Sequence, residues 1–342
     1  MEVPAVSSGR QISCRSGDKI KVNSGPPCHR ASSSRGMSPK GSELFDEMRP
    51  VLVASRALGV APWGRDLRIS LPLALYSAAF MVANLSLGGY IGVQMNMLNS
   101  IFSLSLFSLV LERFQALVVV ATIVVSVTMC FLNGGKLACL AESMSRVDAR
   151  LSAFGLVARR RSCLPLTLGR LLLLVSLPVV GFAGFHTYSS FKTITVEYIC
   201  FVPLAVANMV QVQFITLLSL VTSRVLLLTR HLKKLSACRS HPATVHKLEA
   251  MASVHSSLIA ICEIVQSMFS PQILIVLSSI FIITTANLYH VIDKTVKFLS
   301  GQKDDVNVLL IISYRIFVRS YEVWALIASA VDASTKVVML YF

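Results

Sequence analysis

The chain has 342 residues, a formal net charge of +15, and 54% hydrophobic but only 14% charged residues. Soluble globular domains carry about 25% charged residues, so the composition excludes an ordinary soluble protein. The hydrophobic residues gather into long stretches without charge, and about 20 such residues cross a bilayer as a helix. Because a helix satisfies its own backbone hydrogen bonds within hydrocarbon, we predict an all-α, polytopic membrane protein.

The first segment, residues 1–42, is rich in Ser, Gly and Pro and nearly free of large apolar residues. Such a composition cannot bury a hydrophobic core. We expect a disordered cytoplasmic tail or an extension introduced by gene prediction, followed by a transmembrane domain over residues 43–342.

Six apolar segments are predicted to span the membrane. Five of them contain no Asp, Glu, Lys or Arg: Leu71–Val93, Phe114–Asn133, Leu171–Phe191, Tyr198–Ser223 and Ile264–Ile292. Beyond the fourth and before the fifth, leucines at helical spacing predict that both helices continue outside the membrane, where they offer a place for subunits to associate.

The sixth segment, Asn307–Val331, is as apolar but carries Arg315, Arg319 and Glu322. Either arginine can reach Glu322 on one helical face, at spacings of seven and three residues. Ionisable groups in membrane helices usually face the protein interior and pair with one another. We therefore interpret this segment as a span with an internal ion pair, and an amphipathic surface helix is the alternative.

The distribution of basic residues predicts the orientation. They gather between the second and third segments and after the fourth: Lys136, Arg146, Arg150, Arg159, Arg160, Arg161 and Arg170, then Arg224, Arg230, Lys233, Lys234, Arg239 and Lys247. Loops that hold positive charge stay in the cytoplasm, which places the basic N-terminus there as well. The net charge therefore reflects topology, and we expect no nucleic-acid partner.

Motifs of catalysis and metal binding are missing from the sequence. It has no GxSxG, no HExxH and no Gly-rich phosphate loop, and no CxxC or Cys/His cluster. We predict a protein that is not an enzyme and needs neither a cofactor nor a metal.

Short motifs from about Phe45 onward resemble the insect gustatory receptors, a family of seven-transmembrane chemoreceptors. They are Arg49-Pro50, the run Ser55–Trp63, the stretch from His246-Lys247-Leu248 to Asn287-Leu288-Tyr289, and Val331–Lys336. The resemblance implies a ligand-gated cation channel subunit in the plasma membrane of taste neurons, opened by a small-molecule tastant. It also implies a homo- or hetero-oligomer, a tetramer in related channels.

An insect odorant receptor subunit and, more distantly, a small-solute transporter are the alternatives. A conventional G-protein-coupled receptor is disfavoured, because its N-terminus would lie outside the cell.

The family's best signature is a Thr-Tyr, then apolar residues and a Gln-Phe, within a seventh span that lines the pore in related channels. The chain ends at Phe342 before such a segment. By this resemblance we expect six spans of seven, as in a shortened gene prediction, a splice form or a non-conducting subunit.

The same resemblance implies a ligand pocket in the outer half of the helices that follow the first. Residues at that depth are His186, Tyr188, Phe191, Tyr198, Phe201, Asn287, Tyr289 and His290. Aromatic and polar groups suit an apolar pocket with a few orienting hydrogen bonds. The alternative is that they form the aromatic belt usual at a membrane interface.

Overall fold

A computed structural model of the chain describes residues 42–64, 67–99, 106–156, 169, 172, 191–236, 242–300 and 306–338. The chain divides into two compact units, Met1–Met37 and Ser38–Phe342, and all described residues belong to the second. The predicted N-terminal tail and nearly all of the third predicted span therefore lie outside the described residues.

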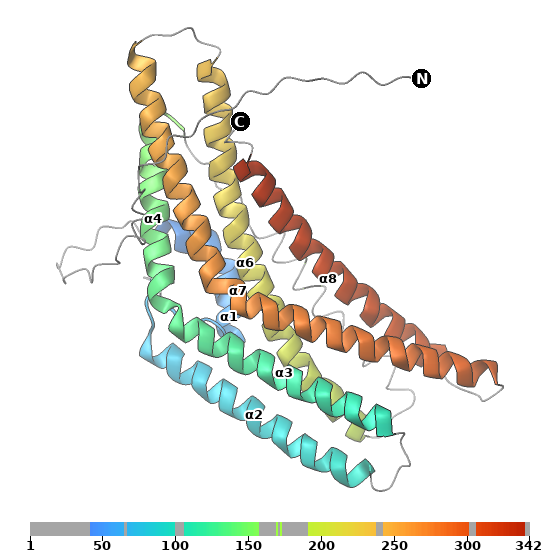
Figure 1. The fold of residues 1–342 in the computed structure, drawn as a ribbon. Coiled ribbons are helices and arrows are strands. Elements are labelled where there is room, and N and C mark those ends of the chain that lie inside the picture. Colours follow the sequence, from blue (N-terminus) through green and yellow to red (C-terminus); the bar gives the residue numbers. More distant parts are fainter. Residues whose placement is uncertain are drawn as a thin grey trace, which may run out of the picture. The chain divides into compact units, whose positions relative to one another are not determined.

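The described residues are almost entirely helical, as the composition predicts (Figure 1). The helices are α1 (Ser42–Ala57), α2 (Leu71–Asn99), α3 (Leu106–Leu132), α4 (Gly134–Ala153), α6 (Phe191–Ser236), α7 (Pro242–Leu299) and α8 (Val306–Val338). Helices α6 and α7 have 46 and 58 residues, which confirms that the fourth and fifth segments continue well beyond a membrane thickness.

Within the described part of the chain, four stretches are long and apolar enough to cross a membrane: Leu71–Tyr90, Arg113–Leu132, Val202–Lys234 and Lys247–Val296. They correspond to the first, second, fourth and fifth predicted spans. Helix α8 is not among these four, and its apolar stretch carries Arg315, Arg319 and Glu322.

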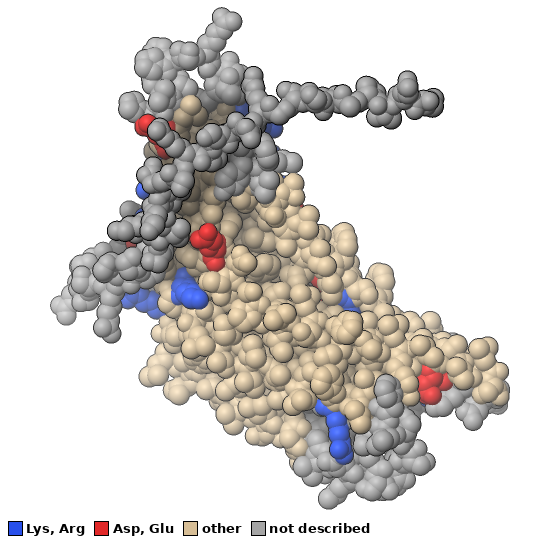
Figure 2. All heavy atoms as spheres, viewed as in Figure 1, with Lys and Arg blue, Asp and Glu red and all other residues tan. Residues whose placement is uncertain are grey.

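Helix α2 shows most directly that the fold requires an apolar solvent. Only 6% of its apolar stretch is buried, and its exposed side carries Leu71, Leu75, Val82 and Tyr90. A helix that is apolar on all sides is either buried in a core or surrounded by lipid. The face of the molecule seen in Figure 2 is correspondingly broad and almost free of charged side chains.

Helix α6 lies at the centre of the bundle. Its apolar stretch is 78% buried, and it packs against α1, α2, α3, α7 and α8. One of its faces joins the main hydrophobic core through Val210, Leu217 and Leu228, all almost fully buried. Helix α6 thus contacts every other described helix. Helix α4 packs mainly against α1, α3 and α7 and is joined to α6 by hydrogen bonds between Arg224 and Asp148.

Two bends lie side by side where α3 passes into α4 and where α7 contains Pro271 (Figure 1). A proline within a helix removes one backbone hydrogen bond and bends the helix. Buried amides connect the two bends in both directions. Asn133 Nδ2 donates to the carbonyl of Met268 at 2.8 Å, and Gln272 Nε2 donates to the carbonyl of Ser126 at 3.1 Å.

We predict that Asn133→Leu and Gln272→Leu each lower the free energy of unfolding by about 1 kcal/mol, because each removes a buried hydrogen bond between helices. Titration with SDS in mixed micelles measures this loss. The control is Asn84→Leu, since that amide bonds only to the Phe80 carbonyl of its own helix. An equal loss in all three variants would show that the hydrogen bonds between the two bends stabilise the fold no more than a hydrogen bond within one helix.

Candidate functional site

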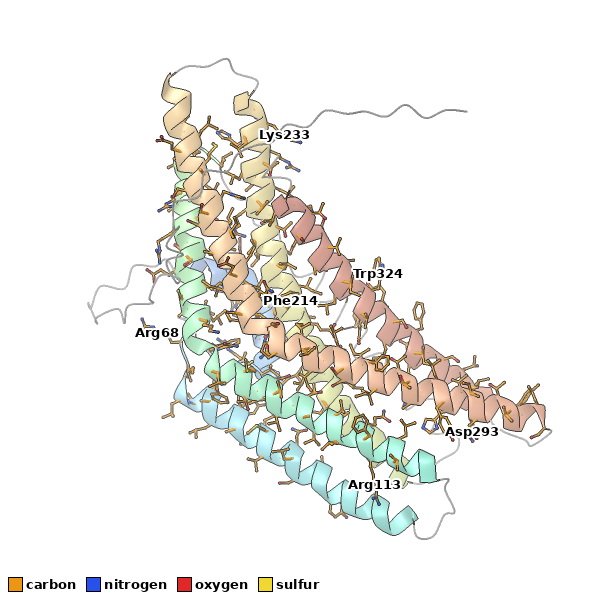
Figure 3. The ribbon with its side chains drawn as sticks, in the orientation of Figure 1. Arg68, Arg113, Phe214, Lys233, Asp293 and Trp324 are labelled. Atoms are coloured by element: carbon orange, nitrogen blue, oxygen red, sulfur yellow. The ribbon has the colours of Figure 1, made fainter. Side chains whose placement is uncertain are left out.

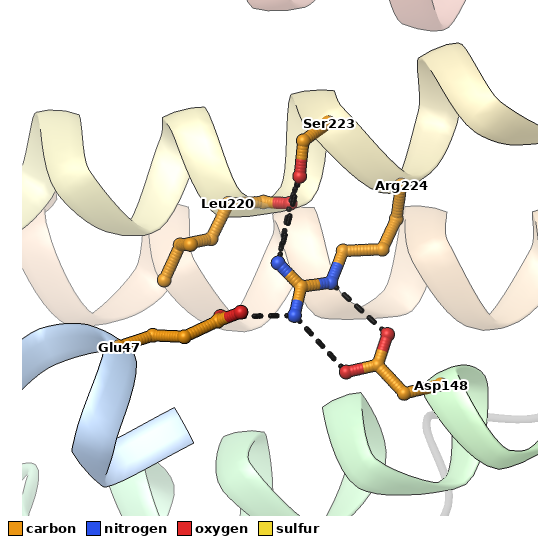
Figure 4. Close-up of polar contacts among 5 residues, drawn as sticks. All are labelled: Glu47, Asp148, Leu220, Ser223 and Arg224. Atoms are coloured by element: carbon orange, nitrogen blue, oxygen red, sulfur yellow. Dashed lines mark hydrogen bonds and ion pairs between the residues drawn. The ribbon is translucent and has the colours of Figure 1, made fainter. Parts of the chain in front are cut away.

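The most deeply buried charge near the C-terminal half of α6 is Arg224, whose side chain is 4% exposed. Its guanidinium binds Asp148 of α4 through two nitrogens, with Nε–Oδ1 at 3.1 Å and Nη2–Oδ2 at 3.0 Å (Figure 4). Nη2 also lies 3.0 Å from Oε2 of Glu47 in α1. We call Arg224, Glu47 and Asp148 the Arg224 cluster.

The cluster is possible because guanidinium is permanently charged and its planar donors match carboxylate geometry. The remaining nitrogen, Nη1, donates to the carbonyl of Leu220 at 3.2 Å and contacts Ser223 Oγ at 3.5 Å. From the sequence, Arg224 was interpreted only as one of the basic residues that predict the orientation in the membrane. Its two acidic partners had no distinguishing local signal, because Glu47 lies beside Asp46 in α1 and α4 holds Glu142 as well as Asp148.

A second buried ion pair lies on α8. Arg319 Nη1 and Glu322 Oε2 are 2.5 Å apart, and their side chains are 3% and 7% exposed. The pair lies on the face of α8 that also buries Val318 and Leu326. Arg315, one turn earlier, is half-buried.

Helices α6, α7 and α8 meet close to this pair. Ala207, Val276 and Ile280 form a small apolar cluster, against which Val323 of α8 packs. Several buried polar side chains lie within about two helical turns of that cluster. These residues, which we call the polar belt, are Asn208, Gln211, Asn287, Arg319 and Glu322.

The polar belt has unused hydrogen-bonding capacity. Asn208 Oδ1, Gln211 Nε2 and Arg319 Nη2 are buried without a hydrogen-bond partner. A buried polar group left unsatisfied costs about 1–3 kcal/mol, so such atoms are normally met by water or by a ligand. The polar belt thus holds two donors and one acceptor that no described protein group satisfies. Sequence inspection passed over Asn208 and Gln211, although amides within an apolar span were visible.

The structure places only part of the predicted ligand group. His186 and Tyr188 lie outside the described residues, and Phe191, Tyr198 and Phe201 belong to the first turns of α6, where side chains are not described. The other three predicted residues lie on α7.

Asn287 is buried and belongs to the polar belt. Tyr289 and His290 are half-buried and contact each other edge to face, with ring centroids 5.7 Å apart. Among the described residues, no cluster of His, Cys, Asp or Glu has the composition of a metal site.

Residues 48–338 match the family model described as 7tm Chemosensory receptor. The match covers most of the chain, which therefore belongs to this family of multi-pass membrane receptors for small molecules. The resemblance seen in the sequence is thereby confirmed. A comparison with curated proteins found no match.

We predict that Arg224→Met lowers the free energy of unfolding by about 3 kcal/mol, because it leaves two carboxylates that are only 10% and 21% exposed without their cation. SDS titration measures the loss. Adding Glu47→Gln and Asp148→Asn to the same chain should restore part of it, since the uncompensated charges are then removed.

The control for this series is Arg146→Met. Arg146 forms an exposed ion pair with Glu142 at 3.5 Å, with the side chains 63% and 71% exposed. Surface pairs of this kind contribute about 1 kcal/mol or less. A similar loss for Arg146→Met and Arg224→Met would show that burial of the Arg224 cluster is unimportant.

Proposed function

We propose that the chain is a gustatory receptor, a subunit of a ligand-gated cation channel in the plasma membrane of taste neurons. Family membership and the motifs that resemble insect gustatory receptors support this proposal. The basic loops support a cytoplasmic N-terminus. In this orientation the N-terminal end of α6 faces the outside, and the Arg224 cluster lies near the inner surface.

Helix α8 is proposed as a further span. Its two faces differ sharply, since Arg319 and Glu322 face the bundle while Phe317, Tyr321 and Trp324 are exposed. Figure 3 shows Trp324 on the outer side of α8. Such a helix can cross a bilayer, because Arg319 and Glu322 are paired inside the protein and the exposed side is apolar and aromatic except for two serines, Ser313 and Ser320.

The observation that carries the functional proposal is the polar belt, with its buried and unpartnered donors and acceptor. Asn208 and Gln211 lie in the half of α6 that precedes its cationic end, which is the outer half in the proposed orientation. A pocket there would suit a small compound with hydroxyl or carbonyl groups, held by a few hydrogen bonds among apolar walls. The aromatic and histidine residues predicted at this depth remain proposed contributors to those walls.

We predict that Gln211→Leu, Asn287→Leu and Arg319→Gln raise the half-maximal concentration of an activating tastant. The loss of one hydrogen bond of about 1.4 kcal/mol corresponds to roughly tenfold. Calcium imaging of cells expressing the chain with a conducting family member, challenged with sucrose, caffeine and glutamate, measures the response.

The control is Thr285→Val, which lies on the exposed side of α7 two residues from Asn287. This variant should leave the dose–response unchanged. Normal responses in every belt variant would remove the belt from the ligand pocket. Uptake of the compounds without any evoked current would favour a transporter over a channel subunit.

A further inference from the structure

A cavity of about 240 Å³ lies between α6 and α8, near their C-terminal ends and apart from the polar belt. Its polar lining comes from Ser219, Thr222 and Ser223 of α6 and from Ser329, Asp332 and Lys336 of α8. A single water needs only on the order of 15 Å³, so the cavity has room for a polar group of several heavy atoms. It opens to the surface, because Ser219 and Asp332 are exposed.

The hydroxyl groups of the cavity lining are mostly acceptors. Thr222, Ser223 and Ser329 each donate their proton to a backbone carbonyl three or four residues earlier in the same helix, at 2.7–2.8 Å. A hydroxyl with its proton committed in this way can offer only lone pairs to another molecule. Ser223 Oγ already contacts Arg224 Nη1 at 3.5 Å. The Thr222 and Ser329 oxygens and the Asp332 carboxylate therefore favour a ligand group that is cationic and rich in N–H donors.

Cations lie at one end of the same cavity. Lys336 Nζ is 2.5 Å from Asp332 Oδ2, and the two side chains are 29% and 56% exposed. On α6, Arg230 and Lys233 follow the cavity residue Leu226 by four and seven residues, so they share its helical face. Arg230 is exposed. The cavity therefore has acceptors along its lining and cations toward the C-terminal ends of α6 and α8.

We propose that this cavity binds the headgroup of phosphatidylethanolamine from the inner leaflet. The primary ammonium occupies the acceptor-lined part beside Asp332, and the phosphate meets Lys336 and Arg230. The proposal rests on the orientation stated under Proposed function, but not on the identity of any tastant. Basic pockets between membrane helices on the cytoplasmic side commonly hold lipid headgroups.

The same chemistry predicts which lipids are excluded. The quaternary ammonium of phosphatidylcholine has no N–H to donate to the serine and threonine oxygens. The headgroup of phosphatidylglycerol has no cation to place beside Asp332, so the charge of its phosphate is not offset there. A preference for phosphatidylethanolamine over both lipids is thus the distinguishing property of the site.

The test uses the full chain purified in detergent, with native mass spectrometry to count bound lipids as each of the three lipids is titrated. We expect phosphatidylethanolamine to bind roughly tenfold more tightly than phosphatidylcholine, and Asp332→Asn to abolish most of that difference. Lys336→Gln should weaken phosphatidylethanolamine binding as well. Glu142→Gln is the matched control, because Glu142 and Arg146 form the same i,i+4 type of ion pair on α4 without lining the cavity.

A second variant, Ser329→Ala, removes one lining hydroxyl without changing the charge, and it serves if Asp332→Asn does not fold. SDS titration of each variant without added lipid measures its stability. Equal binding of the three lipids by the folded chain would overturn the proposal. So would an ethanolamine preference that survives Asp332→Asn, or tighter binding of phosphatidylglycerol that depends on Lys336 alone. Taste responses play no part in this measurement, so its failure would leave the receptor function standing.

Discussion

The pairing of Arg224 with Glu47 and Asp148 is the interaction on which the arrangement of the described helices depends. A charge in a medium of low dielectric is tolerated only when it is paired and hydrogen-bonded. Arg224 meets this condition by drawing one carboxylate from α1 and one from α4 to the central helix α6. A buried ion pair contributes little net stability relative to apolar residues of the same volume. The Arg224 cluster instead specifies how α1, α4 and α6 pack, because few other registers of these helices would leave all three charges compensated.

The same requirement governs the other polar groups within the bundle. Between α3 and α7, the amides of Asn133 and Gln272 satisfy carbonyls at the two bends. On α8, Arg319 is compensated by Glu322 of its own helix. Apolar contacts gain little within a membrane, since lipid is also apolar, and polar contacts of this kind therefore select which helices associate. The unsatisfied buried atoms of the polar belt depart from this requirement, as do those of Gln213 and Thr216 elsewhere on α6. Such atoms are normally met by water or by a ligand.

The elements that could be predicted from sequence are those set by local pattern. Four spans follow from charge-free apolar length, and the contact between Arg319 and Glu322 lies at a spacing that brings any two helical side chains together. Features set by distant partners could not be derived. Arg224 binds residues 76 and 177 positions away, and a charge count assigns it only a side of the membrane. The predicted ligand residues were chosen by depth alone, so they include the buried Asn287 but not Asn208 and Gln211, which are buried on α6.

In the proposed orientation, the Arg224 cluster and the lipid cavity lie on the cytoplasmic side and the polar belt lies toward the outside. Orientation is therefore the property on which the proposed function and the lipid site depend most directly. The decisive measurement is antibody access to two epitope tags in intact and permeabilised cells, one at the N-terminus and one within residues 300–305, between α7 and α8. In the proposed orientation, the second tag is stained on intact cells and the N-terminal tag only after permeabilisation. Staining of the N-terminal tag on intact cells, with the second tag protected, would contradict it.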